Sequence, residues 1–214
     1  MPGTCPKRGV RTIAHIPDGV LSTPILITGA VVTSSLLAVA VRRLDFERIP
    51  QAAVLSAAFF IASLVSVPVG PSSVHLILNG LMGVVLGWAA VPAILVALLM
   101  QAVFFGYGGL LVLGVNSMNI ALPALICGAL LGPALRRSNG RASLFWGAAS
   151  GALGVVLTGI LVSLSLGFSS PDFLPAAKVV LATYAPLMIA EAAVTGFTLG
   201  FILKVAPELI RLQE

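Results

Sequence analysis

Residues 74–105, VHLILNGLMGVVLGWAAVPAILVALLMQAVFF, decide the fold class of this chain. The stretch contains no aspartate, glutamate, lysine or arginine. A helix that crosses the hydrocarbon core of a bilayer, about 30 Å thick, needs about 20 mostly apolar residues. The stretch is long enough to form membrane-inserted helices, and further apolar runs lie on both sides of it. The sequence therefore predicts an all-α integral membrane protein.

The composition supports the same interpretation for the whole chain. Hydrophobic residues make up 58% of the 214 residues and charged residues only 9%, against about 25% charged in an ordinary soluble domain. Such a chain cannot cover a water-exposed surface, so a lipid bilayer is the expected environment. The formal net charge of +5 does not indicate a nucleic-acid partner, because the basic residues lie in short groups between apolar runs and form no continuous basic face.

Seven apolar runs predict about seven transmembrane helices, at 22–42, 51–68, 74–90, 91–105, 115–135, 142–168 and 177–205. Several of these runs are short for a full crossing. The segments at 66–73 and 106–117 are rich in Gly, Pro and Ser, which is typical of broken or re-entrant backbone that lines a cavity. Gly80, Gly83 and Gly87 in the third run are expected to allow close helix packing.

The basic residues predict the orientation of the chain, because short cytoplasmic loops retain Lys and Arg. If the runs alternate, the basic residues after the first, fifth and seventh runs all lie on one side: Arg42, Arg43, Arg48, Arg136, Arg137, Arg141, Lys204 and Arg211. Among the loops, Lys178 alone lies on the other side. We therefore expect the body of the protein to have its amino terminus outside and its carboxyl terminus inside a bacterial cytoplasmic membrane. Lys7, Arg8 and Arg11 oppose this assignment.

The first 14 residues, MPGTCPKRGVRTIA, are expected to be an extension outside the fold. They are basic, but the apolar core and small-residue cleavage site of a secretory signal do not follow directly. Residues 15–205 form the predicted transmembrane domain, and residues 206–214 form a cytoplasmic tail.

The two histidines of the chain, His15 and His75, fall on the outer side in this topology. His15 precedes the first run, and the segment at 66–73 brings His75 toward it. Asn116 and Asn119, which open the fifth run, lie on the same side. Neutral imidazole is a ligand for nickel, cobalt, zinc and copper, so this cluster predicts a metal site. The alternative is a solvated loop residue at position 15 and an interfacial residue at position 75.

Two polar residues within apolar runs are further candidates. Asn79 follows His75 by four residues, so on a helix both would face one pocket, although interhelical hydrogen bonding is an alternative role. Glu191 is the one acid deep within a run, and an intramembrane carboxylate is a functional candidate by default. Its expected place nearer the inner half of its span favours a structural contact to a neighbouring helix or a partner subunit.

Motifs for nucleotide or hydrolytic chemistry are absent, since the chain has no GxxxxGK[ST], HExxH or GxSxG pattern. We therefore expect a chain that is not an enzyme and that needs partners for any energised transport. The rival interpretation is an intramembrane hydrolase that uses His15, His75 and Glu191. Its weakness is spacing, because Glu191 is expected deep in the membrane and both histidines at the outer rim.

Four segments carry a resemblance to a known family: HIPDGVLS at 15–22, GPSSVHLILNGLMGVVLGWAAVPAIL at 70–95, QAVFFGYGGLLVLGVNSMNIALPA at 101–124 and EAAVTGF at 191–197. Together they resemble the substrate-binding (S) subunit of cobalt and nickel energy-coupling-factor transporters, the CbiM/NikM type. The similarity spans nearly the whole chain after residue 14, and four segments in order are far more specific than any one of them. It implies that Co²⁺ or Ni²⁺ is the transported substrate, bound at the outer face, with no resident cofactor.

The resemblance also implies a set of metal ligands. In that family the mature chain begins Met-His, and the metal is held by the terminal amine, by the amide nitrogen and imidazole of that histidine, and by a second histidine. His15 takes the first role and His75 the second, in a pocket to which Asp18 and Ser73 contribute. Four nitrogens in a plane suit nickel(II) or copper(II), with cobalt(II) acceptable. This sequence departs from the pattern at Ala14, which offers a free amine only if it is the mature N-terminus.

Partners are implied as well. They are a membrane-embedded coupling (T) subunit, two cytoplasmic ATPases whose hydrolysis reorients the metal-loaded subunit, and a small accessory membrane subunit as a further candidate. A vitamin-binding subunit of the same transporter class is the second alternative. It predicts an aromatic-lined cavity, whereas aromatic residues make up only 7% of this chain.

Overall fold

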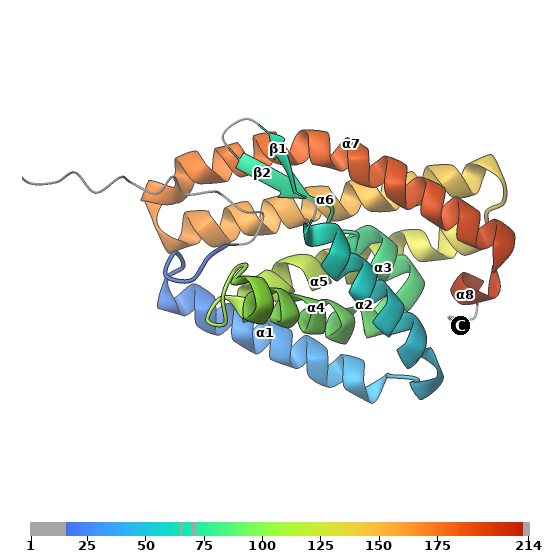
Figure 1. Ribbon diagram of the computed structural model, residues 1–214, viewed down its shortest axis with the longest axis horizontal. Coiled ribbons are helices and arrows are strands. Elements are labelled where there is room, and N and C mark those ends of the chain that lie inside the picture. The colour runs from blue at the N-terminus through green and yellow to red at the C-terminus, as the bar shows by residue number, and fades with distance from the viewer. Residues whose placement is uncertain (1–15, 65, 70–71, 212–214) are drawn as a thin grey trace, which may run out of the picture.

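Helices form most of the computed structural model, which describes residues 16–64, 66–69 and 72–211 (Figure 1). In chain order the elements are α1 Thr23–Arg42, η1 Phe46–Arg48, α2 Ile49–Leu64, β1 Ser66–Val69, β2 Ser72–His75, α3 Asn79–Leu86, η2 Gly87–Ala89, α4 Ala90–Phe105, α5 Leu113–Arg137, α6 Arg141–Ser169, η3 Pro171–Phe173, α7 Leu174–Val205 and α8 Glu208–Arg211. The predicted all-α class is confirmed. Among the described residues, the strands are limited to one short hairpin.

Helix α3 lies at the centre of the bundle, and all eight of its residues are buried. Its sequence, NGLMGVVL, combines apolar side chains with two glycines that admit neighbouring helices. A Cβ atom at Gly83 would lie 1.8 Å from the carbonyl oxygen of Ala124 in α5. A Cβ atom at Gly80 would lie 2.3 Å from the carbonyl oxygen of Ser150 in α6. The predicted role of these two glycines in close helix packing is confirmed.

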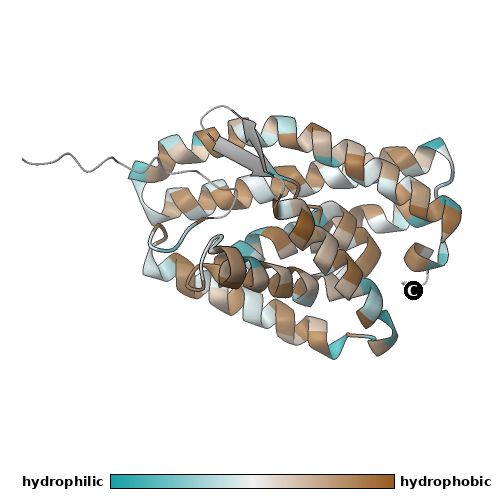
Figure 2. Cartoon of the chain, viewed as in Figure 1, coloured by the Kyte–Doolittle hydropathy of each residue, from teal (hydrophilic) through white to brown (hydrophobic). Residues whose placement is uncertain are grey.

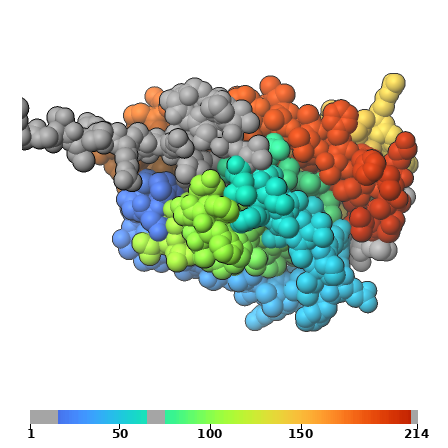
Figure 3. Space-filling model, in the orientation of Figure 1, coloured from blue at the N-terminus to red at the C-terminus, as the bar shows by residue number. Residues whose placement is uncertain are grey.

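Five segments of the described chain are long and apolar enough to cross a membrane: Thr23–Arg42, Asn79–Phe105, Leu113–Arg137, Arg141–Ser169 and Pro171–Val205. Helix α2 has 16 residues and so spans about 24 Å, less than the hydrocarbon core. The seven predicted helices are present, but the third and fourth form one broken span and the second is short. Large apolar side chains such as Phe104, Phe197 and Phe201 remain exposed, as lipid contact requires. Hydrophobic residues predominate along the helices (Figure 2), and the helices pack into one body (Figure 3).

The third predicted helix begins at Asn79 rather than at residue 74. Residues 72–75 form strand β2, which pairs antiparallel with β1 in the register Ser66↔His75. Helix α2 ends at Leu64. The described residues of the segment at 66–73 are non-helical, as predicted, and form two paired strands. Pro68 has no N–H to donate within a helix, and the valines beside it are β-branched, which favours extended backbone.

The central span is broken at Gly87, where the backbone has φ 56° and ψ −124°. Side chains with a Cβ atom rarely adopt this conformation. Gly87 therefore ends α3 and starts the short turn η2, which leads into α4. Gly87 thus has a backbone role that the sequence analysis did not predict.

Most basic residues lie near one end of the helix bundle, which we call the basic end. At the basic end, α1 and α5 finish, α6 begins and α7 finishes (Figure 1). There the Arg43 guanidinium lies 4.9 Å from the centroid of the Trp88 ring, and Arg48 Nη2 donates to the Val85 carbonyl at 3.2 Å. Residues 16–22, the loop at 106–112 and η3 lie at the opposite end.

Helices α6 and α7 pack antiparallel along their length (Figure 1). Glycines of α6 make this contact close. A Cβ atom at Gly151 would lie 2.4 Å from the carbonyl oxygen of Glu191, and one at Gly159 would lie 3.0 Å from the ring of Tyr184. This contact turns the Glu191 and Tyr184 side of α7 toward the centre of the bundle.

Candidate metal centre

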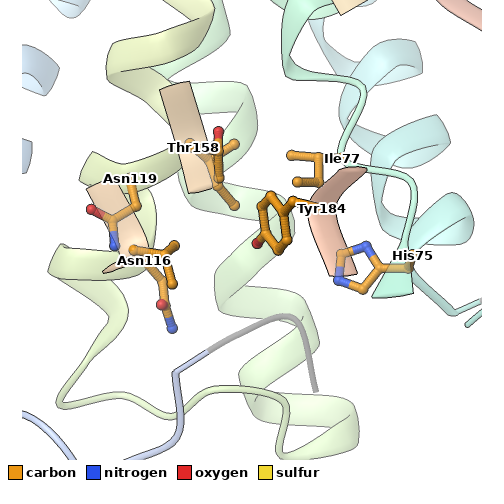
Figure 4. A pocket seen from close by; sticks show the side chains of 8 residues that line it. His75, Ile77, Asn116, Asn119, Thr158 and Tyr184 are labelled. Carbon is orange, nitrogen blue, oxygen red and sulfur yellow. The ribbon is translucent and has the colours of Figure 1, made fainter. Parts of the chain in front are cut away.

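A small cavity lies between β2, α5, α6 and α7, in the half of the bundle opposite the basic end (Figure 4). Its volume of about 10 Å³ is room for about one water-sized group. Its walls combine imidazole, amide and hydroxyl groups with apolar side chains. The lining residues are His75, Ile77, Asn116, Asn119, Ile120, Thr158, Val162 and Tyr184.

His75 is the last residue of β2, and it is only 3% exposed. Figure 4 shows its ring on the side of the cavity that Tyr184 and Ile77 also form. Its Nδ1 atom lies 2.9 Å from the Leu76 carbonyl oxygen. A carbonyl can only accept a hydrogen bond, so this contact requires the proton on Nδ1 and leaves the ring's lone pair on Nε2. Metal-binding histidines commonly donate their other ring N–H to a backbone carbonyl in this way.

Burial also sets the charge of this imidazole. His75 belongs to the hairpin, outside the spanning helices, and its burial lowers its pKa below the usual value of 6.5. Desolvation disfavours the charged form of a buried histidine. The ring is therefore neutral near pH 7, which is the form that binds a metal ion.

Asn116 and Asn119 come from the first turns of α5, and the structure brings both to the same cavity as His75. Asn116 Nδ2 donates to the Ile16 carbonyl at 3.1 Å. Asn119 and Ser165 in α6 are within 3.4 Å of each other through their amide and hydroxyl groups. These bonds place the two amides at the cavity wall and link it to the first described residue of the chain.

Asn79 does not share a helix face with His75, so that prediction is wrong. His75 ends the strand, residues 76–78 form a non-helical turn, and the helix starts only at Asn79 itself. Its amide instead donates to Thr158 Oγ1 at 2.8 Å and to the Gly154 carbonyl at 3.3 Å. Because Thr158 lines the cavity, Asn79 supports the wall from behind.

Asp18 lies beside the site and not in the cavity wall. Its Oδ1 atom accepts from the Val112 N–H at 3.0 Å, and its own N–H donates to the Gly108 carbonyl at 3.1 Å. Gly109, with φ 148°, allows the carboxylate to approach, since a Cβ atom there would lie 2.1 Å from Asp18 Cγ. Asp18 therefore ties the segment before α1 to the loop before α5.

Several predicted site residues fall outside what the structure describes. Ala14 and His15 lie outside the described residues, and for Ser73 the backbone alone is described, as part of β2. The structure does add residues that the sequence analysis did not single out. Thr158 and Tyr184 line the cavity from α6 and α7, and hydroxyl groups inside long apolar helices were the signal that could have indicated them.

Glu191 is fully buried in α7 and contacts the backbone of the His75 segment. Its Oε1 atom accepts hydrogen bonds from the N–H groups of Ile77 and Leu78, the second at 2.9 Å. The predicted wide separation of Glu191 from His75 is therefore wrong, because Ile77 is two residues from His75 and lines the same cavity. The predicted structural contact to a neighbouring element agrees with this geometry.

The donor set of the cavity is neutral. Among the described residues, no group of three or more His, Cys, Asp and Glu side chains could hold a metal ion together. The cavity itself offers one imidazole, two amides and two hydroxyl groups. A metal ion bound at this wall would need ligands beyond the single imidazole.

Comparison with known proteins identifies relatives of the chain. The family model described as the cobalt uptake substrate-specific transmembrane region, CbiM, matches residues 15–209. A Haemophilus influenzae protein named as a candidate metal transport protein is 40% identical over 202 residues, which are 94% of this chain and 98% of that protein. The fused nickel transport protein NikMN of Rhodobacter capsulatus is 40% identical over 114 residues, 50% of this chain and 33% of that longer protein.

Two solved structures share the fold. A crystal structure of a transition metal transporter has a TM-score of 0.74 and 28% sequence identity, and the match covers 89% of this chain and 93% of that one. A truncated transition metal transporter gives the same TM-score at 27% identity, over 89% of this chain and 98% of that one. The same arrangement of helices therefore occurs in proteins described as metal transporters.

Proposed function

Because the chain belongs to the CbiM family of cobalt uptake substrate-specific transmembrane regions, we propose that it captures cobalt or nickel ions for an energy-coupling-factor transporter. The CbiM/NikM resemblance of the sequence is confirmed, and the relatives are metal transport proteins, so the chain is a transport subunit and not an enzyme. The ion binds in the cavity beside His75, at the outer face of the membrane.

The observation that carries this proposal is the size and lining of the cavity. A space for about one water-sized group suits a single ion better than a vitamin, which weighs against the vitamin-binding alternative. Neutral imidazole is a good ligand for nickel and cobalt, and His75 has the backbone partner that orients such a ligand. The amides and hydroxyl groups around it are suited to orienting ligands or a bound water.

His15 is the proposed second histidine ligand. Asn116, in the cavity wall, holds the carbonyl of Ile16, the residue that follows His15 in the chain. Consecutive Cα atoms are about 3.8 Å apart, so the chain before Ile16 starts from the edge of the cavity. If Ala14 is the mature N-terminus, its amine completes a set of four nitrogens with the amide and imidazole of His15 and the imidazole of His75. That set favours square-planar nickel(II).

The outer-face location rests on the distribution of charge. The basic end carries Arg42, Arg43, Arg48, Arg136, Arg137, Arg141 and Lys204, and the backbone of Arg211 ends there too. The positive-inside rule assigns this end to the cytoplasm. The cavity lies in the other half, since Tyr184 is ten residues, or about 15 Å, from the start of α7 at the opposite end.

The chain supplies no energy for uptake, because it has none of the motifs that bind or hydrolyse a nucleotide. We therefore propose that a membrane-embedded coupling subunit and two cytoplasmic ATPases act with it. Co-purification of the chain with those subunits, and stimulation of their ATPase activity by nickel or cobalt, are the expected results.

The test of the metal site is the His75→Ala variant. We expect it to lose nickel and cobalt binding while it remains inserted and folded, because it removes the one imidazole in the cavity wall. Binding is measured by calorimetric titration of the purified protein in detergent, and folding by its thermal unfolding.

The matched control is Gln101→Ala. Gln101 is a fully buried polar residue of α4 that bonds Ser63 and does not line the cavity. Its loss perturbs a buried polar contact, yet the variant should keep its metal affinity. Unchanged nickel and cobalt affinity in His75→Ala would contradict the proposed site.

A further inference from the structure

The chain turns between strand β2 and helix α3 through three residues, Leu76 to Leu78. Leu78 has φ 52°, and it is the one non-glycine residue with positive φ among those described. Neither a strand partner nor a side chain of the helix itself caps this turn. Such a break within a membrane protein leaves backbone N–H groups without the water that would satisfy them elsewhere.

Glu191 supplies the missing acceptor from the middle of α7. Its carboxylate accepts from two successive N–H groups, those of Ile77 and Leu78. The contact joins positions 114 and 113 residues apart in the sequence. It is a directional contact, because one oxygen must lie opposite both N–H groups, and it fixes the place of the turn relative to α7.

The position of this turn sets the position of two residues that line the cavity. His75 precedes it directly, and Ile77 within it also lines the cavity. Tyr184, a third wall residue, lies seven residues before Glu191, which is about two helical turns, so both side chains project from one face of α7. The same helix face therefore forms part of the cavity and anchors the strand end that brings the imidazole to it.

The residues after the turn are held by a different helix. Asn79 bonds Thr158 and Gly154 of α6, and Ser150 Oγ donates to the Gly80 carbonyl at 3.0 Å. Helix α3 would stay seated on α6 without Glu191. The turn before it, which carries His75, would lose its hydrogen bonds to α7.

We propose that Glu191 is a positioning residue for metal capture, which holds His75 at the cavity by fixing the backbone of Ile77 and Leu78. This inference rests on the proposed function. It assigns to an intramembrane carboxylate the role of a backbone anchor for a ligand on another element, and it does not place Glu191 on the metal. The length of the side chain and its acceptor oxygen hold the turn in place, and its negative charge is not needed for this role.

Two substitutions separate reach from charge. Glu191→Gln keeps the chain length and the Oε1 acceptor and removes the charge. The Oε2 atom it replaces has no hydrogen-bond partner among the described residues, so the exchange breaks no bond seen in the structure. Glu191→Asp keeps the charge but is shorter by one methylene, so its carboxylate no longer reaches the turn.

We expect Glu191→Gln to keep nickel and cobalt affinity within about threefold of the wild type, and Glu191→Asp to weaken it by about tenfold or more, as losses of partners that orient a ligand do. Affinity is measured by titration in detergent. The visible spectrum of the nickel complex reports ligand geometry, and a purely structural role would leave that spectrum unchanged. The matched control is Thr195→Val, one turn further along α7 and equally buried, which should bind as the wild type does.

Three results would overturn the inference. They are metal binding by Glu191→Asp as tight as that of the wild type, metal binding by Glu191→Gln as weak as that of Glu191→Asp, or weaker binding by Glu191→Asp with an unaltered nickel spectrum. If Glu191→Asp does not fold, Glu191→Gln decides alone, and lost affinity with unchanged thermal unfolding would contradict the proposal. The wild type and His75→Ala are measured alongside. If the wild type binds neither metal, the proposed function itself is contradicted. If the wild type binds normally and the Glu191 variants bind equally well, only the role of Glu191 is contradicted.

Discussion

Among the described residues that line the cavity, His75 carries the one imidazole, and its protonation state decides whether it can act as the proposed metal ligand. Its Nδ1 hydrogen bond to the Leu76 carbonyl fixes which ring nitrogen holds the lone pair. Burial lowers its pKa and so keeps the ring neutral. Burial outweighs the hydrogen bond to the Leu76 carbonyl, which by itself would raise the pKa. The ring is therefore uncharged in the folded protein, which is the form that binds a metal ion.

This lowered pKa predicts a pH-dependent stability. As the pH falls through 6.5, the unfolded chain takes up a proton on His75 while the folded protein resists it. The free energy of unfolding therefore decreases as the pH is lowered from 6.5 to the lowered pKa. Above pH 6.5 it does not depend on the protonation of His75. We expect the unfolding temperature of the metal-free protein to drop between pH 7 and about pH 5.

The variant for comparison is His75→Gln, which has a similar size and does not titrate. Its unfolding temperature should depend less on pH in that window, and the two pH profiles should run parallel above pH 6.5. Profiles of the same slope below pH 6.5 would show that the group responsible is not His75.

At this scale the sequence predicted part of the candidate site. Helix alternation and the positive-inside rule placed His75, Asn116 and Asn119 on one side, and the structure brings these three to one cavity. Tyr184 and the backbone contacts of Glu191 could not be predicted in the same way. Which residue of α7 faces the cavity depends on the register of the α6–α7 contact, and the apolar residues of α7 are spread around the helix, so they do not reveal that register.

Among the elements, α3 depends on the absence of side chains at its glycines. We expect Gly83→Ala to destabilise the protein by about 1–3 kcal/mol, the usual cost of overpacking. The new Cβ atom would meet the backbone carbonyl of Ala124 at 1.8 Å, and backbone atoms cannot step aside as a flexible side chain can. The change is measured as the midpoint of thermal or denaturant unfolding in detergent.

The control is Gly167→Ala in α6. A Cβ atom there meets only the end of the Leu174 side chain, at an ordinary 3.6 Å. Alanine has the higher helix propensity, so this variant should be as stable as the wild type or slightly more so. Equal stability of Gly83→Ala and the wild type would mean that α3 and α5 are not packed as closely as described.

Element positions were largely predictable because membrane helices need long apolar runs, which the sequence displays directly. The hairpin was not. The run SVPV continues the apolar character of α2, and hydropathy alone does not distinguish a strand from one more helical turn. The late start of α3 has the same cause, since the hydrogen bonds that replace helical ones at Ile77 and Leu78 come from Glu191, far away in sequence.

For the molecule as a whole, the orientation of the bundle can be tested with thiol labelling. Cysteines introduced as Asp172→Cys and Ala142→Cys lie at exposed positions at opposite ends. The positive-inside rule predicts that position 172 reacts with a membrane-impermeant maleimide in intact cells. Position 142 should react only after the membrane is permeabilised.

The background for this experiment is a chain with Cys5→Ser. Cys127 is fully buried and can remain as an internal check that the protein stays folded, since it should not be labelled at either stage. Labelling of position 142 from outside, with position 172 protected, would reverse the orientation and place the cavity toward the cytoplasm.

The contacts of α3 also order events during synthesis. The ribosome releases this short, fully buried helix before α5 and α6, the helices with which it packs most extensively, have been synthesised. The hydrogen-bond acceptor of the Ile77 N–H is translated 114 residues later. The nascent chain therefore holds the proposed metal-binding segment unassembled until α7 has entered the bilayer, and competence to bind an ion would arise only when translation is nearly complete.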